Sequence, residues 1–314
     1  MKVLFVGLGS IGARHLKNLW AACEAKGACP EVTALRSAPR VLGEELAPLV
    51  MREVQTLPEN ESWDIAFVTG PTHLHAQTLE MLKGRAGAFF IEKPVFQNAN
   101  HDLDKIGLQP GQKAYVAAPM RWCGTYLALR KALDGLPVYS VRAICSSYLP
   151  DWRPAADYRT VYSARREMGG GVTLDLIHEW DYLADLFGLP EKSYNLRGTY
   201  SQLEVSSDDI SVYIAQYPRF LCEVHLDYFG RAYRRTLEVF SEEGTLTADF
   251  GRGTLTLPDG TVQDCTEPVN RRYEREMEYF LQYAAGDAAE SVNSPAHALR
   301  VLQLAESPCW PPRA

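Results

Sequence analysis

The first third of the chain alternates short, almost continuously apolar runs with longer amphipathic segments. The apolar runs have the length of strands, and the segments between them carry apolar residues at helical spacing. Apolar strands that alternate with helices are typical of a parallel sheet covered on both faces. The predicted strands are 3–6, 32–35, 65–68, 88–91 and 114–117, and the predicted helices include 13–25 and 75–83.

Further along the chain, apolar and polar residues alternate with a period of two. Turn signals such as Pro258-Asp259-Gly260 separate these runs, which is typical of an antiparallel or mixed sheet with one half-exposed face. We interpret residues 308–314 as a frayed tail. The predicted strands are 139–148, 194–203, 210–216, 220–228, 235–240 and 244–250, and the predicted helices are 172–187, 271–285 and 295–305.

A glycine-rich turn follows the first predicted strand directly. The run Gly7-Leu8-Gly9-Ser10-Ile11-Gly12 fits G-x-G-x-x-G and opens an amphipathic helix, which is the context that this motif requires. Its glycines permit a tight turn, the approach of a pyrophosphate and close packing of helix on strand, while the helix N-terminus favours phosphate. The predicted cofactor contacts are Gly7, Gly9, Ser10, Ile11 and Gly12.

The residues after the second predicted strand bear on the choice of cofactor. This strand ends in Arg36 and Ser37. No acidic residue occurs between Glu31 and Glu44. An acid here favours NAD, whereas an arginine accommodates the 2′-phosphate of NADP. We therefore expect Arg36 and Ser37 to favour NADP(H), with NAD(H) as the alternative if Arg36 is only a solvated charge.

Together these patterns predict an α/β protein of two domains, which suits a length of 314 residues. Residues 1–119 form an NAD(P)-binding Rossmann domain with a doubly wound parallel sheet. Residues 120–314 form an α+β domain with a large open, mostly antiparallel sheet, which binds substrate and mediates oligomerisation. Because a half-apolar open face usually packs against its own copy, we expect a homodimer or homotetramer.

Composition excludes several classes of protein. The formal net charge of −7 and the lack of a long basic run argue against nucleic-acid binding. No apolar stretch reaches 18 residues, and the first apolar run is too short for a signal peptide. The seven cysteines form no C-x-x-C pair, which favours reduced thiols over a zinc site. We expect a cytoplasmic protein without a metal, nucleic-acid or membrane partner.

Four segments of the chain carry motifs that occur together, in this order, in one protein family. They are Gly12-Ala13-Arg14-His15, Gly70-Pro71-Thr72-His73-Leu74-His75, Glu92-Lys93-Pro94, and the glycine triplet 169–171 that leads to Asp175 and His178. Together they resemble the glucose–fructose oxidoreductase / inositol dehydrogenase / rhizopine-catabolism (Gfo/Idh/MocA) family. The resemblance implies a Rossmann domain followed by an open-sheet domain, and reversible hydride transfer between NAD(P) and a sugar, cyclitol or related hydroxyl compound.

The resemblance also implies roles for individual residues. Lys93 would lie near the nicotinamide ring and the reacting oxygen. Asp175 and a histidine one helical turn later would complete the catalytic site. On the cofactor side, the residues implied are Pro71, His75 and Glu92.

The spacing between Asp175 and the candidate histidine differs from the spacing in many members of the family. Many members place the histidine four residues after the aspartate, whereas His178 lies three residues after Asp175 and Glu179 stands at the fourth position. Both spacings lie on one face of a helix. His178 is therefore the first candidate for proton transfer, and Glu179 is the second.

These residue types suit alcohol oxidation. The cofactor takes the hydride, and the protein must manage the proton of the hydroxyl group. Histidine titrates near neutral pH, and a lysine ammonium can stabilise a developing alkoxide. The alternatives are that His178 is a hydrogen-bonded core residue and that Lys93 forms a structural ion pair with Glu92 or another acid.

A segment of aromatic and arginine residues precedes the glycine triplet. Aromatic faces pack on sugar rings, and arginines bind carboxylates or phosphates in bidentate fashion. We therefore expect a sugar-like substrate that carries an anionic or nucleotide group, unless these residues form a subunit interface. The predicted substrate contacts are Arg121, Trp122, Tyr148, Trp152, Arg153, Arg159 and Glu179.

The sequence is also compatible with two other functions. An NADP(H)-binding sensor or regulatory scaffold would use the first domain without turnover. A reductase of a non-sugar C=C or C=N bond could use the same architecture.

Overall fold

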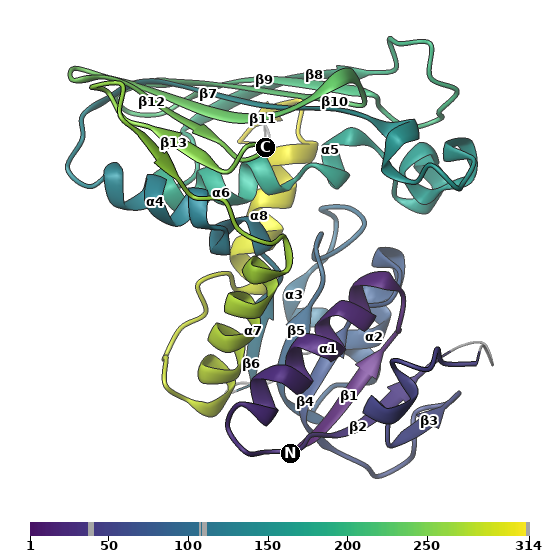
Figure 1. The fold of residues 1–314 in the computed structure, drawn as a ribbon. Helices are drawn as coiled ribbons and strands as arrows, with labels where there is room; N and C mark the ends of the chain where they lie inside the picture. The colour runs from purple at the N-terminus through teal and green to yellow at the C-terminus, as the bar shows by residue number, and fades with distance from the viewer. Residues whose placement is uncertain (37–40, 107, 109–111, 312–314) are drawn as a thin grey trace. The chain divides into compact units, whose positions relative to one another are not determined.

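The chain folds into two compact units, each with its own sheet (Figure 1). The sequence-based division ended the first domain at residue 119 and placed all later residues in the second. In the structure, residues 270–299 return to the first unit. The computed structural model describes residues 1–36, 41–106, 108 and 112–311. The first unit holds Met1–Pro119 with Asn270–Leu299, and the second holds Met120–Val269 with the segment from Arg300 onward.

Six parallel strands form the sheet of the first unit, in the order β3-β2-β1-β4-β5-β6. The chain extends outward in opposite directions from β1 and β4, so the topological switch lies between these two strands. This order and the parallel pairing confirm the Rossmann prediction. The strands are β1 (Lys2–Val6), β2 (Glu31–Leu35), β3 (Arg52–Val54), β4 (Trp63–Val68), β5 (Ala86–Ile91) and β6 (Lys113–Val116).

Helices α1 (Ser10–Glu24) and α7 (Asn270–Ala285) contribute to the same core against this sheet. Phe67 of β4 and Phe90 of β5 have ring centroids 5.2 Å apart. Phe280 of α7 meets these two rings edge-on, at 5.7 and 5.1 Å respectively. Burial of this aromatic cluster explains why α7 folds with the first unit although it follows the second sheet in sequence.

The hydrophobic pattern did not predict strand β3, which follows β2 in the chain. Strand β3 has only three residues, and both Arg52 and Glu53 are exposed because it lies at the sheet edge. Its pairing with β2 is a tertiary contact without an apolar signature in sequence. The remaining elements of this unit are η1 (Ala47–Leu49), η2 (Thr72–Leu74), α2 (His75–Met81) and α3 (Leu103–Ile106).

The second unit contains a nine-stranded sheet in the order β14-β13-β12-β11-β7-β10-β9-β8-β15. Its pairs are antiparallel except for β7 with β10, which confirms a mostly antiparallel sheet. The strands are β7 (Val138–Tyr148), β8 (Lys192–Gly198), β9 (Ile210–Gln216), β10 (Leu221–Asp227), β11 (Phe229–Ser241), β12 (Gly244–Asp249), β13 (Thr254–Thr256), β14 (Val262–Asp264) and β15 (Cys309–Trp310).

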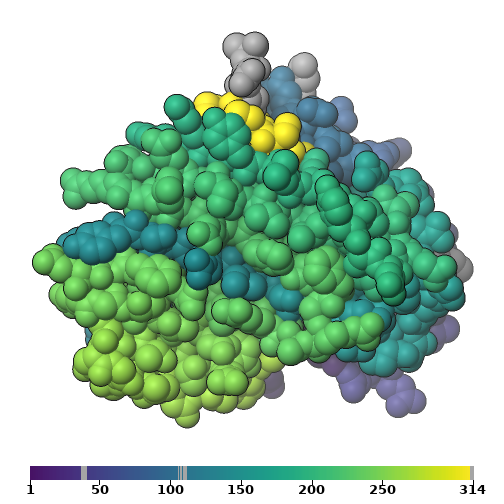
Figure 2. All heavy atoms as spheres, turned by 90° about the horizontal axis from the view of Figure 1, so that it is seen from above, coloured from purple at the N-terminus to yellow at the C-terminus, as the bar shows by residue number. Residues whose placement is uncertain are grey.

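The two faces of this sheet differ. Helices α4 (Gly124–Ala132) and α6 (His178–Phe187) lie on one face (Figure 1), where Trp180 of α6 meets Tyr213 of β9 edge-on at 5.2 Å. Figure 2 looks down on the other face, which is open. Apolar side chains that alternate with the buried set are exposed there: Tyr194, Leu196, Ile214 and Leu221.

The C-terminal segment is more ordered than the sequence predicted. Strand β15 pairs with β8 and forms an edge of the sheet, and the indole N–H of Trp310 donates to the carbonyl of Pro190 at 3.2 Å. The expectation of a fully frayed tail is therefore wrong for Cys309 and Trp310. A two-residue strand is too short to leave a periodic pattern, so only its pairing partner identifies it.

The seven cysteines are free thiols, and four of them are buried. Among the residues that the structure describes, none of the helices combines the length with the hydropathy that a membrane span requires.

Candidate active site

The glycine turn after β1 has the backbone that its motif predicts. Gly7 has φ +93°, and a Cβ there would lie 2.7 Å from the Cα of Gly70. A Cβ on Gly12 would lie 2.6 Å from the carbonyl oxygen of Gly7, so α1 can approach β1 only with glycine at this position. A Cβ on Gly9 would meet no atom within 4 Å. Open space therefore adjoins the N-terminus of α1.

A cleft of about 700 Å³ opens at the carboxyl edge of the first sheet. Ligands of doubly wound sheets bind at this edge, beside the topological switch. Helix α1 begins here with Ser10 and Ile11, and Gly9 supplies no side-chain cap to the helix N-terminus. The first N–H groups of a helix have no intrahelical partner, so this end of α1 suits a phosphate. The lining includes Gly7, Leu8, Arg36, Gln55, Thr56 and Pro71.

Arg36 lies in the cleft directly after β2. Its guanidinium forms an ion pair with the carboxylate of Glu53 on the neighbouring strand β3, and its side chain is 13% exposed. The charge that would attract a 2′-phosphate is thus already partly compensated by an acid. Ser37, the other predicted specificity residue, lies outside the described residues.

Pro71 and His75 occupy different environments. Pro71 is exposed and lines the cleft. His75 is 1% exposed, and its ring nitrogens lie 3.2 Å from the carbonyl oxygen of Val95 and 3.1 Å from that of Gly70. Burial lowers the pKa of His75, which favours a neutral ring. This geometry favours a role in joining the loops after β4 and β5 over direct contact with a cofactor.

Glu92 and Lys93 follow β5, and the peptide bond between Lys93 and Pro94 is cis. Glu92 is buried. One carboxylate oxygen lies 2.5 Å from Nε2 of His15, and the other accepts the backbone N–H of Lys93 at 3.0 Å. Burial pushes the pKa of Glu92 upward, but the hydrogen bond from His15 and the neighbouring charges outweigh it and lower the pKa. Glu92 is therefore an internal group, whereas Lys93 is half-buried at the sheet edge.

In the second unit, the predicted helix 172–187 is interrupted. Helix α5 (Val172–Asp175) ends before Leu176, whose φ of −99° and ψ of 25° leave the helical region, and α6 begins at His178. Asp175 thus ends one helix and His178 begins the next. The expectation that both lie on one face of a single helix is wrong, because the chain turns between them.

Two tyrosine hydroxyl groups hold the carboxylate of Asp175. Tyr228, at the junction of β10 and β11, donates to Oδ2 at 2.5 Å, and Tyr162 of η6 (Tyr162–Ala164) donates to Oδ1. Burial and the adjacent charge of Asp175 raise the pKa of both tyrosines well above its usual range. Both hydroxyl groups therefore stay protonated and remain donors near neutral pH.

Glu179, the second candidate for proton transfer, is fully buried on α6. Its carboxylate accepts two hydrogen bonds from the guanidinium of Arg235 on β11, at 2.6 and 3.0 Å. This bidentate pair lies between helix and sheet and favours a structural role for Glu179. His178 is half-buried and remains the candidate from this pair.

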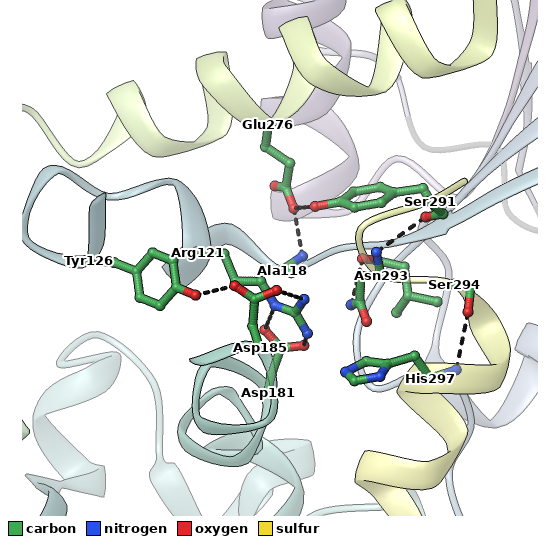
Figure 3. Close-up of polar contacts among 12 residues, drawn as sticks. Ala118, Arg121, Tyr126, Asp181, Asp185, Glu276, Ser291, Asn293, Ser294 and His297 are labelled. Carbon is green, nitrogen blue, oxygen red and sulfur yellow. Dashed lines mark hydrogen bonds and ion pairs between the residues drawn. The ribbon is translucent and has the colours of Figure 1, made fainter. Parts of the chain in front are cut away.

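Arg121 is also committed to the interior of the second unit. Its guanidinium donates to both oxygens of Asp181, at 2.9 and 2.7 Å, and to Asp185 at 2.8 Å (Figure 3). Tyr126 of α4 donates to the second oxygen of Asp185. This cluster fixes α6 to the segment that follows β6, which favours a structural role for Arg121 over substrate binding. Trp122, next to it, is half-buried.

Tyr148 and Trp152, two of the aromatic residues predicted to contact substrate, each pack against a residue at the start of β11 or just before it. The guanidinium of Arg231 lies 3.7 Å from the ring centroid of Tyr148. Trp152 is 40% exposed, meets the ring of Tyr228 edge-on at 5.3 Å and donates from its indole N–H to Ser147 at 3.1 Å. Tyr228 also donates a hydrogen bond to Asp175, so Trp152 lies next to one of the two tyrosines that hold this carboxylate.

The two remaining arginines among the predicted substrate contacts, Arg153 and Arg159, are exposed. Arg159 donates to Asp157 and, at 2.9 Å, to Glu204, so acidic neighbours already compensate its charge. Arg153 lies in an exposed stretch of the same segment.

Sequence reasoning missed three side chains near the candidate residues. His15 was noted only within a motif, although a histidine on the apolar stripe of α1 is a signal for a buried partner. Tyr162 and Tyr228 carry no comparable signal, because hydroxyl contacts across 13 and 53 residues depend on the tertiary fold.

Comparison with known proteins identifies relatives in sequence. Residues 1–105 match the GFO_IDH_MocA family model, described as an oxidoreductase family with an NAD-binding Rossmann fold. The chain is 23% identical to inositol 2-dehydrogenase of Rhizobium meliloti (strain 1021), over 96% of this chain and 94% of that protein. It is 25% identical to D-xylose dehydrogenase of Paenarthrobacter nicotinovorans, over 62% of this chain but only 55% of that protein.

Solved structures share the fold over almost the whole chain. A levoglucosan dehydrogenase in complex with NADH and levoglucosan has a TM-score of 0.80 at 16% identity, covering 98% of this chain and 95% of that one. The myo-inositol 2-dehydrogenase from Lactobacillus plantarum has a TM-score of 0.77 at 17% identity, covering 98% and 96%. The family model over residues 1–105 and the sequence relatives support a Gfo/Idh/MocA-type oxidoreductase, and the solved structures show the same two-part fold.

Proposed function

We propose that this protein is a dehydrogenase that transfers a hydride between NAD(P) and a hydroxyl-bearing carbon of a sugar, cyclitol or sugar derivative. One observation carries the proposal. The glycine turn after β1 and Lys93 after β5 both lie at the carboxyl edge of the same sheet, where ligands of doubly wound folds bind. A nucleotide cradle and a cationic side chain at one edge suit redox chemistry on an oxygen-bearing carbon.

In this proposal, the cofactor and three side chains have separate roles in the reaction. The nicotinamide, when bound, supplies the hydride acceptor or donor. Lys93 stabilises negative charge on the reacting oxygen, and His178 takes up or returns its proton. Asp175, held by two tyrosine hydroxyl groups, orients the histidine or the substrate hydroxyl.

We propose NADP(H) as the preferred cofactor because Arg36 lines the cleft at the position that distinguishes the two dinucleotides. The ion pair with Glu53 limits this preference, because a 2′-phosphate must compete with the carboxylate for the guanidinium. NAD(H) therefore stays a usable cofactor in this proposal.

We propose an uncharged sugar or cyclitol as the substrate. Two arginines that suggested an anionic substrate, Arg121 and Arg159, are already paired with carboxylates. The relatives named for D-xylose and for inositol act on uncharged polyhydroxyl compounds. The exposed Trp152 offers an aromatic surface of the kind on which sugar rings pack.

We also propose a homodimer or homotetramer in the reducing cytoplasm. The open face of the second sheet supports self-association because it exposes Leu196 and Ile214 beside side chains of both charge signs, such as Arg142 and Glu223. The seven free thiols suit a reducing compartment.

Oxidation of D-xylose, myo-inositol, a sugar acid and a nucleotide sugar with NADP⁺ and NAD⁺ tests the function. Lys93→Met should lower kcat by roughly 100-fold or more, because a charge stabiliser of the transition state is lost, while cofactor binding survives. Lys83→Met, an exposed lysine of the same unit, is the matched control and should behave as the wild type.

Two results would redirect the assignment, and a third would contradict the role of Lys93. Tight NADPH binding without turnover of any substrate class, together with a stable protein partner, would support the sensor. Turnover confined to C=C or C=N substrates would support the reductase, and near-normal turnover in Lys93→Met would contradict the role of this lysine.

A further inference from the structure

We infer that His15 and Glu92 form a positioning pair that fixes the peptide carrying Lys93 to helix α1, the helix that begins at the cofactor turn. The pair lies entirely within the first unit. The inference rests on the proposed function, because the pair affects turnover only through Lys93.

The geometry of Glu92 supports this role. Its carboxylate uses one oxygen toward Nε2 of His15, at 2.5 Å, and the other toward the backbone N–H of Lys93, at 3.0 Å. A carboxylate held at both oxygens has no freedom to rotate without losing a contact. The orientation of the Lys93 peptide is therefore tied to the position of His15 on α1.

The surroundings of the pair show that packing alone does not require it. His15 is fully buried, its ring lies 4.6 Å from that of Phe90, and the ring of Tyr273 on α7 meets it edge-on at 6.0 Å. Neighbouring inward positions of α1 are leucines, Leu16 and Leu19. Apolar side chains of similar size often stabilise a core as well as a buried polar pair does, so stability alone does not explain why this core holds one.

We infer that this core holds a polar pair because the pair orients Lys93. His15 lies near the start of α1, whose N-terminus carries the glycine cradle, and Glu92 lies one residue before Lys93. The cradle and the lysine are thus positioned from one rigid helix. A displacement of about 1 Å in a reacting group can cost roughly 100-fold in rate, so this connection matters more for turnover than for cofactor affinity.

Substitutions at His15 test the pair by its effect on chemistry. His15→Leu should lower kcat by roughly 10- to 100-fold for D-xylose or myo-inositol, whichever the wild type oxidises, with little change in KM or in cofactor Kd. Deuterium at the oxidised carbon should slow this variant more than the wild type. His15→Gln, whose Nε2 restores a donor to Glu92, should recover most of kcat.

The matched control is Asn18→Leu on the same helix. Asn18 is buried and exchanges hydrogen bonds of 3.4 and 2.8 Å with Asn270 of α7, so its loss also loosens α1 but leaves Glu92 intact. It should keep the wild-type kcat. Equal losses of kcat in His15→Leu and Asn18→Leu, or in His15→Leu and His15→Gln, would overturn the inference.

A second variant covers the case in which His15→Leu leaves a buried carboxylate unpaired and fails to fold. His15→Leu/Glu92→Leu removes both polar groups, should fold, and should show the same loss of kcat. Wild-type kcat in this double variant would equally overturn the inference.

Amide hydrogen exchange at Lys93 reports on the pair without any substrate. Exchange should accelerate in His15→Leu and in the double variant, but not in Asn18→Leu. If the wild type oxidises neither sugar nor cyclitol, the proposed function fails, while this measurement still decides whether the pair holds the peptide. Unchanged exchange at Lys93 in both variants would contradict the pair.

Discussion

The carboxylate of Asp175 shows how single residues shape the candidate site. It accepts hydrogen bonds from two tyrosines that lie on different elements, and Tyr228 is fully buried. Hydrogen bonds to a charged group are stronger than those between neutral groups. This arrangement fixes the direction in which Asp175 can act on a neighbouring histidine or hydroxyl group.

Removal of one tyrosine hydroxyl tests that arrangement. Tyr228→Phe should lower kcat/KM by roughly 10- to 100-fold, because a hydrogen bond to a charged group contributes about 1.5–3 kcal/mol. Steady-state kinetics measures the loss. Tyr213→Phe is the matched control, since its buried hydroxyl group donates to Ala305 at 2.8 Å, and it should retain activity. Wild-type kinetics in Tyr228→Phe would contradict a role in holding Asp175.

The balance between Arg36 and Glu53 is a second property of individual residues. Arg36→Ala should lower kcat/KM for NADP⁺ relative to NAD⁺ by about 10-fold, the effect of one charge-assisted hydrogen bond. Glu53→Gln should shift the ratio the other way, because the guanidinium loses its competitor. Kinetics with both cofactors measures the ratio. A clear NAD preference that neither variant changes would refute the NADP(H) assignment.

At the scale of elements, buried charge holds α6 in place. Glu179 pairs with Arg235 of the sheet, and Asp181 and Asp185 pair with Arg121. Because three acidic side chains of one short helix are satisfied internally, the helix that follows Asp175 is fixed in rotation. His178 is the first residue of this helix, so the orientation of its backbone is fixed as well.

His75 connects two loops of the first unit and makes their stability depend on pH. Burial lowers its pKa in the folded state below the usual value of about 6.5, so the unfolded chain binds more protons between the two values. The free energy of unfolding should therefore fall as pH drops through about 6.5. Urea unfolding at pH 7.5 and 5.5 measures this slope. His75→Gln should reduce it, and an unchanged slope would show that His75 does not titrate as described.

At the scale of the whole molecule, the open face of the second sheet is a surface that favours binding of a partner. Leu196 is 82% exposed, and the strand register puts Tyr194, Ile214 and Leu221 on the same face. Exposed apolar side chains on a broad sheet favour association, and a closed assembly satisfies them with identical surfaces.

Charge on that face should break the assembly. Leu196→Glu/Ile214→Glu should convert the oligomer to a monomer, because carboxylates would be buried without partners. Size-exclusion chromatography with light scattering measures the mass. Val262→Glu, at an exposed position of the edge strand β14, is the control and should leave the mass unchanged. A monomeric wild type would refute the proposed oligomer.

The sequence predicted the elements whose signal is local. The glycine turn, the strands β1, β4 and β5 and the alternating strands of the second sheet all carry periodic or steric signatures within a few residues. Strand β3, strand β15 and the break between α5 and α6 carry no such signature, because pairing partners and a local turn define them.

What the sequence determined by itself was the class of each sheet, the strands with a periodic signature, the cofactor turn and the family resemblance, since each follows from the spacing of residues along the chain. What only the tertiary structure decided was which polar side chains are interior partners and which face solvent. Glu179, Arg121, His75 and Glu92 resemble site residues in sequence, yet they are buried. The physical reason is that a charged or titratable group is buried only where a distant partner compensates it, and the identity of that partner emerges only on folding.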